Sequence, residues 1–369
     1  MKSKITLSLI SALLASPVFA MPQPYGKIDL SVDYMPRDNH LNKDDHHVQF
    51  NSNNTLFGIK GEEKLNQRFS VMYQSEWTFI LKRNGNETFT PRNQLIGIQD
   101  KQLGTLKYGK NDTPLKQLGV IVDSYNHAVE NNADMQGIMG GENRIDNTLT
   151  YESPAFKVAD AKINATLMLP IGPSDHIQKS KGGAKVAGKD IGRTFSGSIV
   201  YKAPVVTAGL AYDYAIPTNF LRKGYITAID TETSTSGAFA AANTIRAIAK
   251  VDLDNGLSLR GLYQNAEVNQ EKGNSANAVN IDQANSWLVG VEYQLPQAKK
   301  WTLKAQYTQT NTNMKNGQED RDIWQVMGGA DYAFSKTLRA YGYAGYLTLE
   351  QGAKEDNQLL IGQAVEWKF

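Results

Sequence analysis

Residues 357–369 read NQLLIGQAVEWKF, and the fold class can be inferred from their alternation. Apolar side chains stand on alternate positions at Leu359, Ile361, Val365 and Trp367, and the row ends on Phe369. A period of two is that of a β-strand with one apolar face. We therefore expect a strand that runs to Phe369 and is held there by a neighbouring strand.

The opposite end of the sequence has the pattern of an export signal. Lys2 and Lys4 precede a short apolar run, and the small residue Ala20 follows Val18 and Phe19. A charged start, an apolar centre and a small-residue cleavage site define a secretory signal. The apolar run is too short to span a bilayer. We expect residues 1–20 to be a signal peptide, cleaved near Ala20, and residues 21–369 to form one exported domain.

Composition narrows the functional classes. The chain has 39 basic and 37 acidic residues, and two of the lysines lie in the expected signal, so the remainder is balanced. A balanced chain lacks the basic footprint of a nucleic-acid-binding protein. The chain has no cysteine, which excludes disulfides and a thiol catalyst. After the signal, no apolar run is long enough for a transmembrane helix.

Alternation recurs along the rest of the chain. In residues 301–310, WTLKAQYTQT, apolar and polar residues alternate, and residues 243–253, NTIRAIAKVDL, do the same. Several apolar faces begin or end on a tyrosine next to a short turn, at Tyr151, Tyr201 and Tyr332. Aromatic residues at the rim of an apolar band are typical of a membrane–water interface.

The connections between these segments are alternately short and long. Short turns are expected at KLNQR, KQLGT, LDNGL and FSKT. Long polar segments are expected at about 36–53, 82–91, 112–143, 172–192, 215–242, 268–283, 312–320 and 350–356. Eight long and seven short connections join sixteen strands. Such a pattern describes a closed outer-membrane barrel, because an open strand edge in lipid would leave peptide groups unpaired.

Several pieces of the chain together resemble a known family. They are YGKIDLSVDY, TLFGIKGEEKL, RNQLIGIQDKQLGTLKYGKNDTPLK, RIDNTLTYESPAF, YAFSKTL and the final WKF. In this order they resemble the trimeric general porins of Gram-negative bacteria. The resemblance implies an all-β fold, a 16-stranded antiparallel transmembrane β-barrel with short periplasmic turns, long extracellular loops and a third loop folded inward. It also implies a homotrimer in the outer membrane, and the weak alternation of 92–101 and 104–110 suggests the contact surface.

The resemblance also implies a pore constriction. The third loop, about 112–143, would face the pore with its acids, which are Asp123, Glu130, Asp134 and Glu142. The opposing basic wall would contain the family's positions Lys27, Arg92 and Arg144. Leu56 stands where the family often has an arginine, which weakens the basic wall. Lys60 and Arg68 are expected to face the pore nearby and to replace the missing positive charge.

These expectations predict a water-filled channel for passive diffusion of small hydrophilic solutes and ions. Other expected partners are outer-membrane lipid, lipopolysaccharide and the barrel assembly machinery, for which Trp367 and Phe369 would close the barrel and act as the assembly signal. Two alternatives stay open: a substrate-specific channel and, less favoured, a barrel enzyme. No catalytic motif is present, and an enzyme is not expected.

No cofactor or metal is predicted. His46 and His47 follow Asp44 and Asp45, but adjacent side chains rarely point at one centre, and no fixed ligand spacing accompanies them.

Overall fold

The computed structural model describes residues 21–36, 46–79, 89–172, 194–226, 238–270 and 276–369. The expected signal, residues 1–20, lies outside the described residues. Within them, no helix is both long and apolar enough to cross a membrane.

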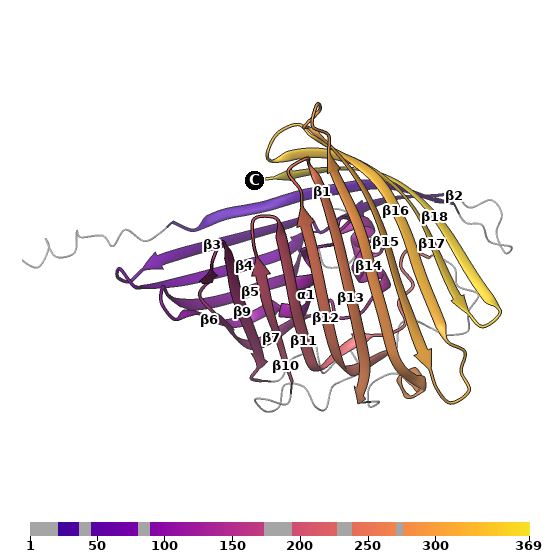
Figure 1. Ribbon diagram of the computed structural model, residues 1–369, viewed down its shortest axis with the longest axis horizontal. Helices are drawn as coiled ribbons and strands as arrows, with labels where there is room; N and C mark the ends of the chain where they lie inside the picture. The colour runs from indigo at the N-terminus through magenta and orange to yellow at the C-terminus, as the bar shows by residue number, and fades with distance from the viewer. Residues whose placement is uncertain (1–20, 37–45, 80–88, 173–193, 227–237, 271–275) are drawn as a thin grey trace, which may run out of the picture.

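The strands form one closed antiparallel sheet (Figure 1). Both β2 (His46–Ser52) and β3 (Leu56–Lys64) pair with β1 (Gln23–Pro36), so they form one barrel strand broken at 53–55. In the same way β7 (Arg144–Glu152) and β8 (Phe156–Val158) both pair with β9 (Ala161–Pro170). With these two merged, the eighteen elements make sixteen barrel strands, as predicted.

The remaining strands follow one another around the barrel. They are β4 (Phe69–Phe79), β5 (Phe89–Asp100), β6 (Gly104–Asp112), β10 (Phe195–Lys202), β11 (Val206–Asn219), β12 (Phe239–Asp252), β13 (Leu257–Gln270), β14 (Ile281–Gln294), β15 (Trp301–Met314), β16 (Arg321–Ala333), β17 (Leu338–Gln351) and β18 (Lys354–Lys368). Within the described residues, the helical segments are α1 (Pro114–Val120), α2 (Ala128–Asn131), α3 (Met135–Ile138) and η3 (Ala276–Asn280).

The barrel closes between β1 and β18. Lys27 pairs with Lys368 and Tyr34 with Ile361 at the two ends of this ladder. Beyond the ladder, the Gly26 and Phe369 backbones exchange two hydrogen bonds, of 3.0 and 3.1 Å. The strand predicted from the C-terminal alternation is therefore confirmed, and its end is held by β1.

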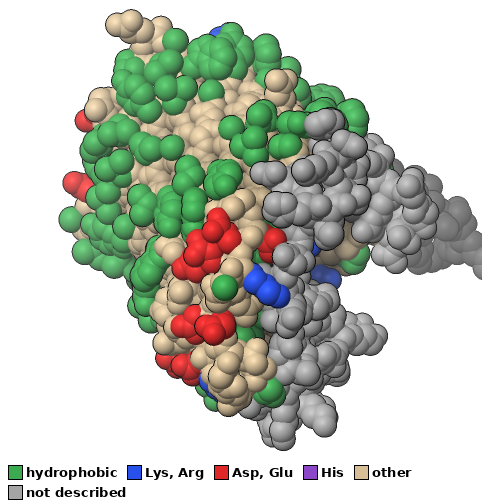
Figure 2. Space-filling model, turned by 90° about the vertical axis from the view of Figure 1, so that its right-hand side faces the viewer, with side chains coloured by type: hydrophobic (Ala, Val, Ile, Leu, Met, Phe, Trp, Pro, Cys, Tyr) green, Lys and Arg blue, Asp and Glu red, His purple; other side chains and the backbone are tan. Residues whose placement is uncertain are grey.

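The outer wall is apolar. On β18, Leu359, Ile361 and Val365 are exposed on the outside together with the polar Gln363, whereas Leu360, Gly362 and Ala364 are buried on the inward face. Figure 2 shows apolar side chains spread broadly over one face, with acidic side chains gathered on its lower part. A charge placed on such a surface costs about 2–4 kcal/mol at mid-bilayer, which explains why outward positions are apolar.

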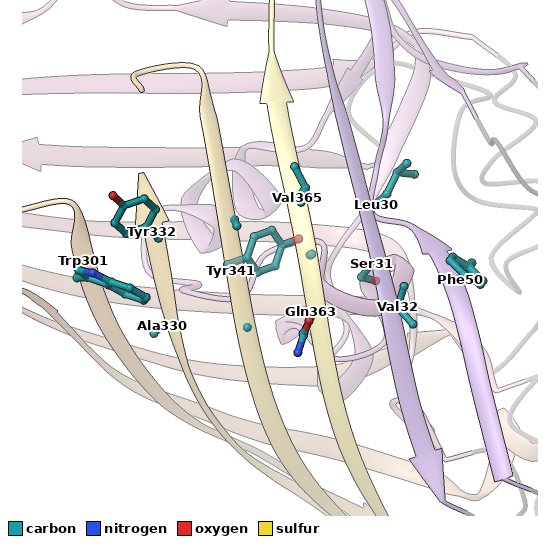
Figure 3. A pocket seen from close by; sticks show the side chains of 13 residues that line it. Leu30, Ser31, Val32, Phe50, Trp301, Ala330, Tyr332, Tyr341, Gln363 and Val365 are labelled. Carbon is teal, nitrogen blue, oxygen red and sulfur yellow. The ribbon is translucent and has the colours of Figure 1, made fainter. Parts of the chain in front are cut away.

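One part of the outer wall is hollowed (Figure 3). A groove of about 670 Å³ runs across β15–β18, β1 and β2, and small side chains including Ala330 and Ala340 line it. Trp301 and Tyr332 line one side of the groove, and Phe50 lies on the opposite side. The groove is on the outer surface and is no part of the lumen.

The connections agree with the sequence at the short turns but not everywhere at the long loops. The turns at 65–68, 101–103, 253–256 and 334–337 are short, as predicted. The expected long loop at 350–356 is wrong: β17 and β18 are joined by residues 352–353, and Gly352 takes the positive φ of 61° that this tight turn needs. The first expected loop, 36–53, is also too long, because β2 occupies its second half.

Candidate functional site

Loop 3, residues 113–143 between β6 and β7, lies inside the barrel. Helix α1 contacts β10, β11 and β12, and α3 contacts β15 and β16. In Figure 1 the helices of this loop are seen behind the front strands. Thr113 caps α1 by accepting a hydrogen bond from the Lys116 backbone, and Pro114 begins the helix. The inward-folded third loop is therefore present.

Loop 3 is attached to the inner wall by two apolar clusters. In the first, Leu115, Leu118 and Val122 pack against Ile248 and Leu262 of β12 and β13. The second joins residues of loop 3 with β16, β17 and β18 and contains Tyr125, Val129, Ile138, Met327, Leu347 and Leu360. Full burial of one such side chain contributes about 1.5–3 kcal/mol. Where loop 3 packs, the apolar inward side chains of this half of the barrel are therefore covered.

The fifth loop adds to this covering. Its described residues 220–226 pack beside loop 3, where Tyr225 and Ile226 belong to the second cluster. The Gly224 backbone donates to the Gly137 carbonyl of α3 at 2.9 Å. Two loops therefore occupy the β11–β18 side of the lumen, which leaves the β1–β7 side as the aqueous passage.

A buried arginine ties loop 3 to the wall. Arg246 of β12 is wholly buried and binds Glu142 at 2.6 Å. It also donates to the carbonyls of Leu115 and Gly140, both at 3.0 Å, and to Gln264 at 2.8 Å. One guanidinium thus binds both ends of the loop, with the fixed fork geometry that suits arginine to this task.

Three of the four predicted loop acids are turned away from the passage. Asp123 is buried and accepts hydrogen bonds from the backbones of Tyr125 and Met135 and from Gln306. Asp134 caps α3 through the Gly137 backbone and is 1 % exposed. Burial raises the pKa of both Asp123 and Asp134, and the neighbouring charge of Asp123 raises the pKa of Asp134 further.

Glu142 is the third, since it is held by Arg246. Glu130 is the exposed acid, and its carboxylate accepts from the Ser52 backbone at 3.2 Å. His127 lies beside it in the loop, where burial lowers its pKa well below the usual value, so that its ring is neutral.

Arg92 and Arg144 come together on the opposing wall. With Glu76, Asp112 and Lys116 they form a group that we call the eyelet cluster. Arg144 and Lys116 each lie 3.1 Å from the Asp112 carboxylate, and Arg92 lies 3.6 Å from Glu76. All five side chains retain partial solvent exposure, between 11 and 16 %.

The other predicted bases lie elsewhere on the same wall. Lys27 is 3.1 Å from Asp29 and 3.5 Å from Glu366, near the short-turn end. Lys60 lies over the Tyr25 ring, 4.9 Å from its centroid. Arg68 belongs to the turn between β3 and β4, half-exposed, and is bound to Asp100 at 2.6 Å. The structure therefore does not bring Arg68 to the eyelet cluster.

A belt of alternating charge continues around the inner wall near the short turns. Neighbouring strands contribute opposite charges, and the pairs are Glu366–Arg339, Arg339–Asp331, Lys304–Asp331 and Arg260–Glu292. The sequence showed that these strands carry charged residues at inward-facing positions, but it did not show which charges pair.

Sequence reasoning missed four site residues. Lys116 and Asp112 lie at the loop entrance but were not assigned to the wall, and Glu76 and Arg246 were not singled out at all. Glu76 and Arg246 could have been found from the sequence, because each is a charged residue on the polar, inward-facing side of its strand. Trp367 and Phe369 lie on the outer rim, half-exposed, with ring centroids 5.6 Å apart.

The arrangement provides a passage lined by paired charged side chains. The carboxylates of the eyelet cluster are each engaged by a cation, and within the described residues no three metal-ligating side chains gather. Ion pairs on one wall with a packed loop on the other suit passage of solutes better than their capture.

Comparisons with known proteins agree with the fold. A family model described as Gram-negative porin matches residues 6–352. The anion-selective porin from Comamonas acidovorans is 16 % identical, with a TM-score of 0.68 over 95 % of this chain and 100 % of that one. OmpF of Salmonella typhi in complex with daunomycin is 15 % identical, with a TM-score of 0.63 over 94 % of this chain and 97 % of that one. No curated protein matches the chain significantly.

Proposed function

The chain belongs to the Gram-negative porin family, and on this basis we propose that the eyelet cluster is where its channel sorts solutes. The protein is an outer-membrane barrel that conducts small hydrophilic solutes and ions by passive diffusion. The observation that carries the assignment of the site is the position of loop 3, whose packing against β11–β18 narrows the passage to the wall that carries Arg92 and Arg144.

The charges of this wall support diffusion with little retention. Each of the two arginines is already engaged by a carboxylate, so a passing solute exchanges one polar contact for another and binds weakly. Weak binding is what a channel needs, because a solute must leave as readily as it enters. Lys27 and Lys60 extend the polar wall toward the short-turn end.

Further proposals concern the mature protein. We propose that residues 1–20 are removed on export and that 21–369 form the barrel, which assembles as a homotrimer. We place the proposed contact surface on β5 and β6, where the alternation of residues 92–101 and 104–110 is weak. Lipopolysaccharide and the barrel assembly machinery, the latter through Trp367 and Phe369, are the remaining proposed partners. We also propose that the protein is a channel and not an enzyme.

Planar-bilayer recording of the purified, refolded protein tests this function. We expect large, ohmic, constant steps in potassium chloride. Small steps that a particular sugar or dicarboxylate blocks would favour a substrate-specific channel instead. An absence of steps from correctly folded protein, judged by its heat-modifiable migration on a gel, would refute the channel.

A further inference from the structure

Loop 3 contains more acidic residues than it presents to the aqueous passage. The loop carries four acids between Asp123 and Glu142, yet Asp123 and Asp134 are buried and Glu142 is paired with Arg246. Burial also raises the pKa of the first two, which opposes their ionisation. Most of the acidic charge of the loop is therefore withdrawn from the passage.

The loop instead contributes a cation to the passage. Helix α1 packs Leu115 and Leu118 against the wall, and Lys116 is turned toward the opposite side, where it is 3.1 Å from Asp112. Arg144 shares the same carboxylate at 3.1 Å. One carboxylate thus lies between two cations, so that it balances only one of them.

The rest of the cluster does not remove this excess. Arg92 has Glu76 as its acidic neighbour, and Glu76 also accepts hydrogen bonds from Tyr25 and Gln74. The eyelet cluster therefore contains three cations and two carboxylates, a net charge of one positive unit. Nearby, Lys27 is balanced by Asp29 at 3.1 Å. The exposed acid Glu130 accepts from the Ser52 backbone and is not a member of the cluster.

We propose that the eyelet prefers small anions, such as chloride, carboxylates and phosphate, and that Lys116 is the residue of loop 3 that sets this preference. The proposal rests on the channel function proposed above. It also gives the buried acids a different part from the one expected from sequence, since they shape the loop and do not attract cations.

Reversal potentials across a bilayer in a tenfold gradient of potassium chloride, with the dilute side at about 0.1 M, test the proposal. A unit charge about 5 Å from the ion path in water changes the local concentration of a monovalent ion roughly 2-fold at this salt. Because anions and cations respond in opposite directions, Lys116→Gln should lower the chloride-to-potassium permeability ratio roughly 4-fold, and Lys116→Glu roughly 10-fold or more.

Two further variants make the test specific. Lys336→Glu changes the same charge in an exposed turn between β16 and β17 and should leave the ratio unchanged. Asp123→Asn neutralises a buried acid and should also leave it unchanged. The effect of Lys116→Glu should fade near 1 M salt, where the screening length is about 3 Å.

The outcomes separate the two proposals. A conducting wild-type pore that prefers potassium, or an Asp123→Asn shift as large as that of Lys116→Gln, would overturn the anion preference and leave the channel intact. A wild-type protein that folds but does not conduct would refute the channel itself. The Lys116→Gln variant, which keeps a polar side chain at a partly exposed position of α1, guards against a loss of folding in Lys116→Glu.

Discussion

Replacing Arg246 by alanine should detach loop 3 from the wall without unfolding the barrel. The substitution takes the arginine donor away from the buried Glu142 carboxylate and the Leu115 carbonyl, while the Gly140 carbonyl keeps its hydrogen bond from Gln264. Removing one partner of a buried ion pair costs about 3–5 kcal/mol. If that cost falls on the loop, the population of any detached state rises roughly 10²- to 10³-fold or more.

Thiol labelling measures this population directly. The chain has no cysteine, so Val122→Cys introduces a single thiol at a wholly buried position of the first apolar cluster. A water-soluble thiol reagent should react with it slowly in the Val122→Cys protein and much faster when Arg246→Ala is added. Single-channel traces of Arg246→Ala should also show excursions to higher conductance.

Control variants decide whether the ion pair is responsible. Arg68→Ala removes an arginine from an exposed turn. It should change neither the labelling rate of Val122→Cys nor the frequency of excursions to higher conductance. Replacing both partners by apolar residues, Arg246→Leu with Glu142→Leu, should recover much of the protection, because removal of both charges is often nearly neutral. Equal labelling rates with and without Arg246 would refute the reasoning, since the apolar clusters alone would then hold the loop.

The other predictions concern protonation, assembly and oligomeric state. Because burial raises the pKa of Asp134, the packed loop binds this proton more tightly than the unfolded chain and gains stability as pH falls; it loses that stability as pH rises through the raised pKa. Labelling of Val122→Cys should therefore accelerate with pH relative to the same label in an Asp134→Asn protein, and parallel profiles would contradict this. Phe369→Ser, which removes the aromatic ring beside Trp367, should lower the amount of folded protein in the outer membrane, whereas normal heat-modifiable levels would count against it. Light scattering in mild detergent should give the mass of three chains, and a monomer would exclude the trimer.

Much of the barrel could be predicted because strand faces follow a simple period. The alternation of residues predicts that the apolar row of β18 faces outward and that Arg92 faces inward. The structure confirms both positions. The lengths of the extracellular connections could not be predicted in the same way. The polar residues of β2 and of the β17–β18 turn look like loop, because strands that extend beyond the bilayer need no apolar face.

Only part of the candidate site could be predicted from the sequence. Ile248 lies on the charged face of β12, between Arg246 and Lys250. The alternation of residues along β12 does not reveal that loop 3 covers Ile248. The directions of the loop acids were equally hidden, because an irregular segment has no period to reveal which side chains turn inward. That Asp134 would cap a helix was visible only once the turn of α3 was known.

The pairing of β1 with β18 has a consequence for biogenesis. On its β18 side, the first strand finds its partners in residues 361–368, so this one edge stays bare until almost the whole polypeptide has been exported. An exposed edge of this kind templates aggregation, and contacts so distant in sequence form slowly. We therefore expect the nascent protein to need chaperones in the periplasm during its transit, and we expect a chain truncated before residue 361 to form no closed channel.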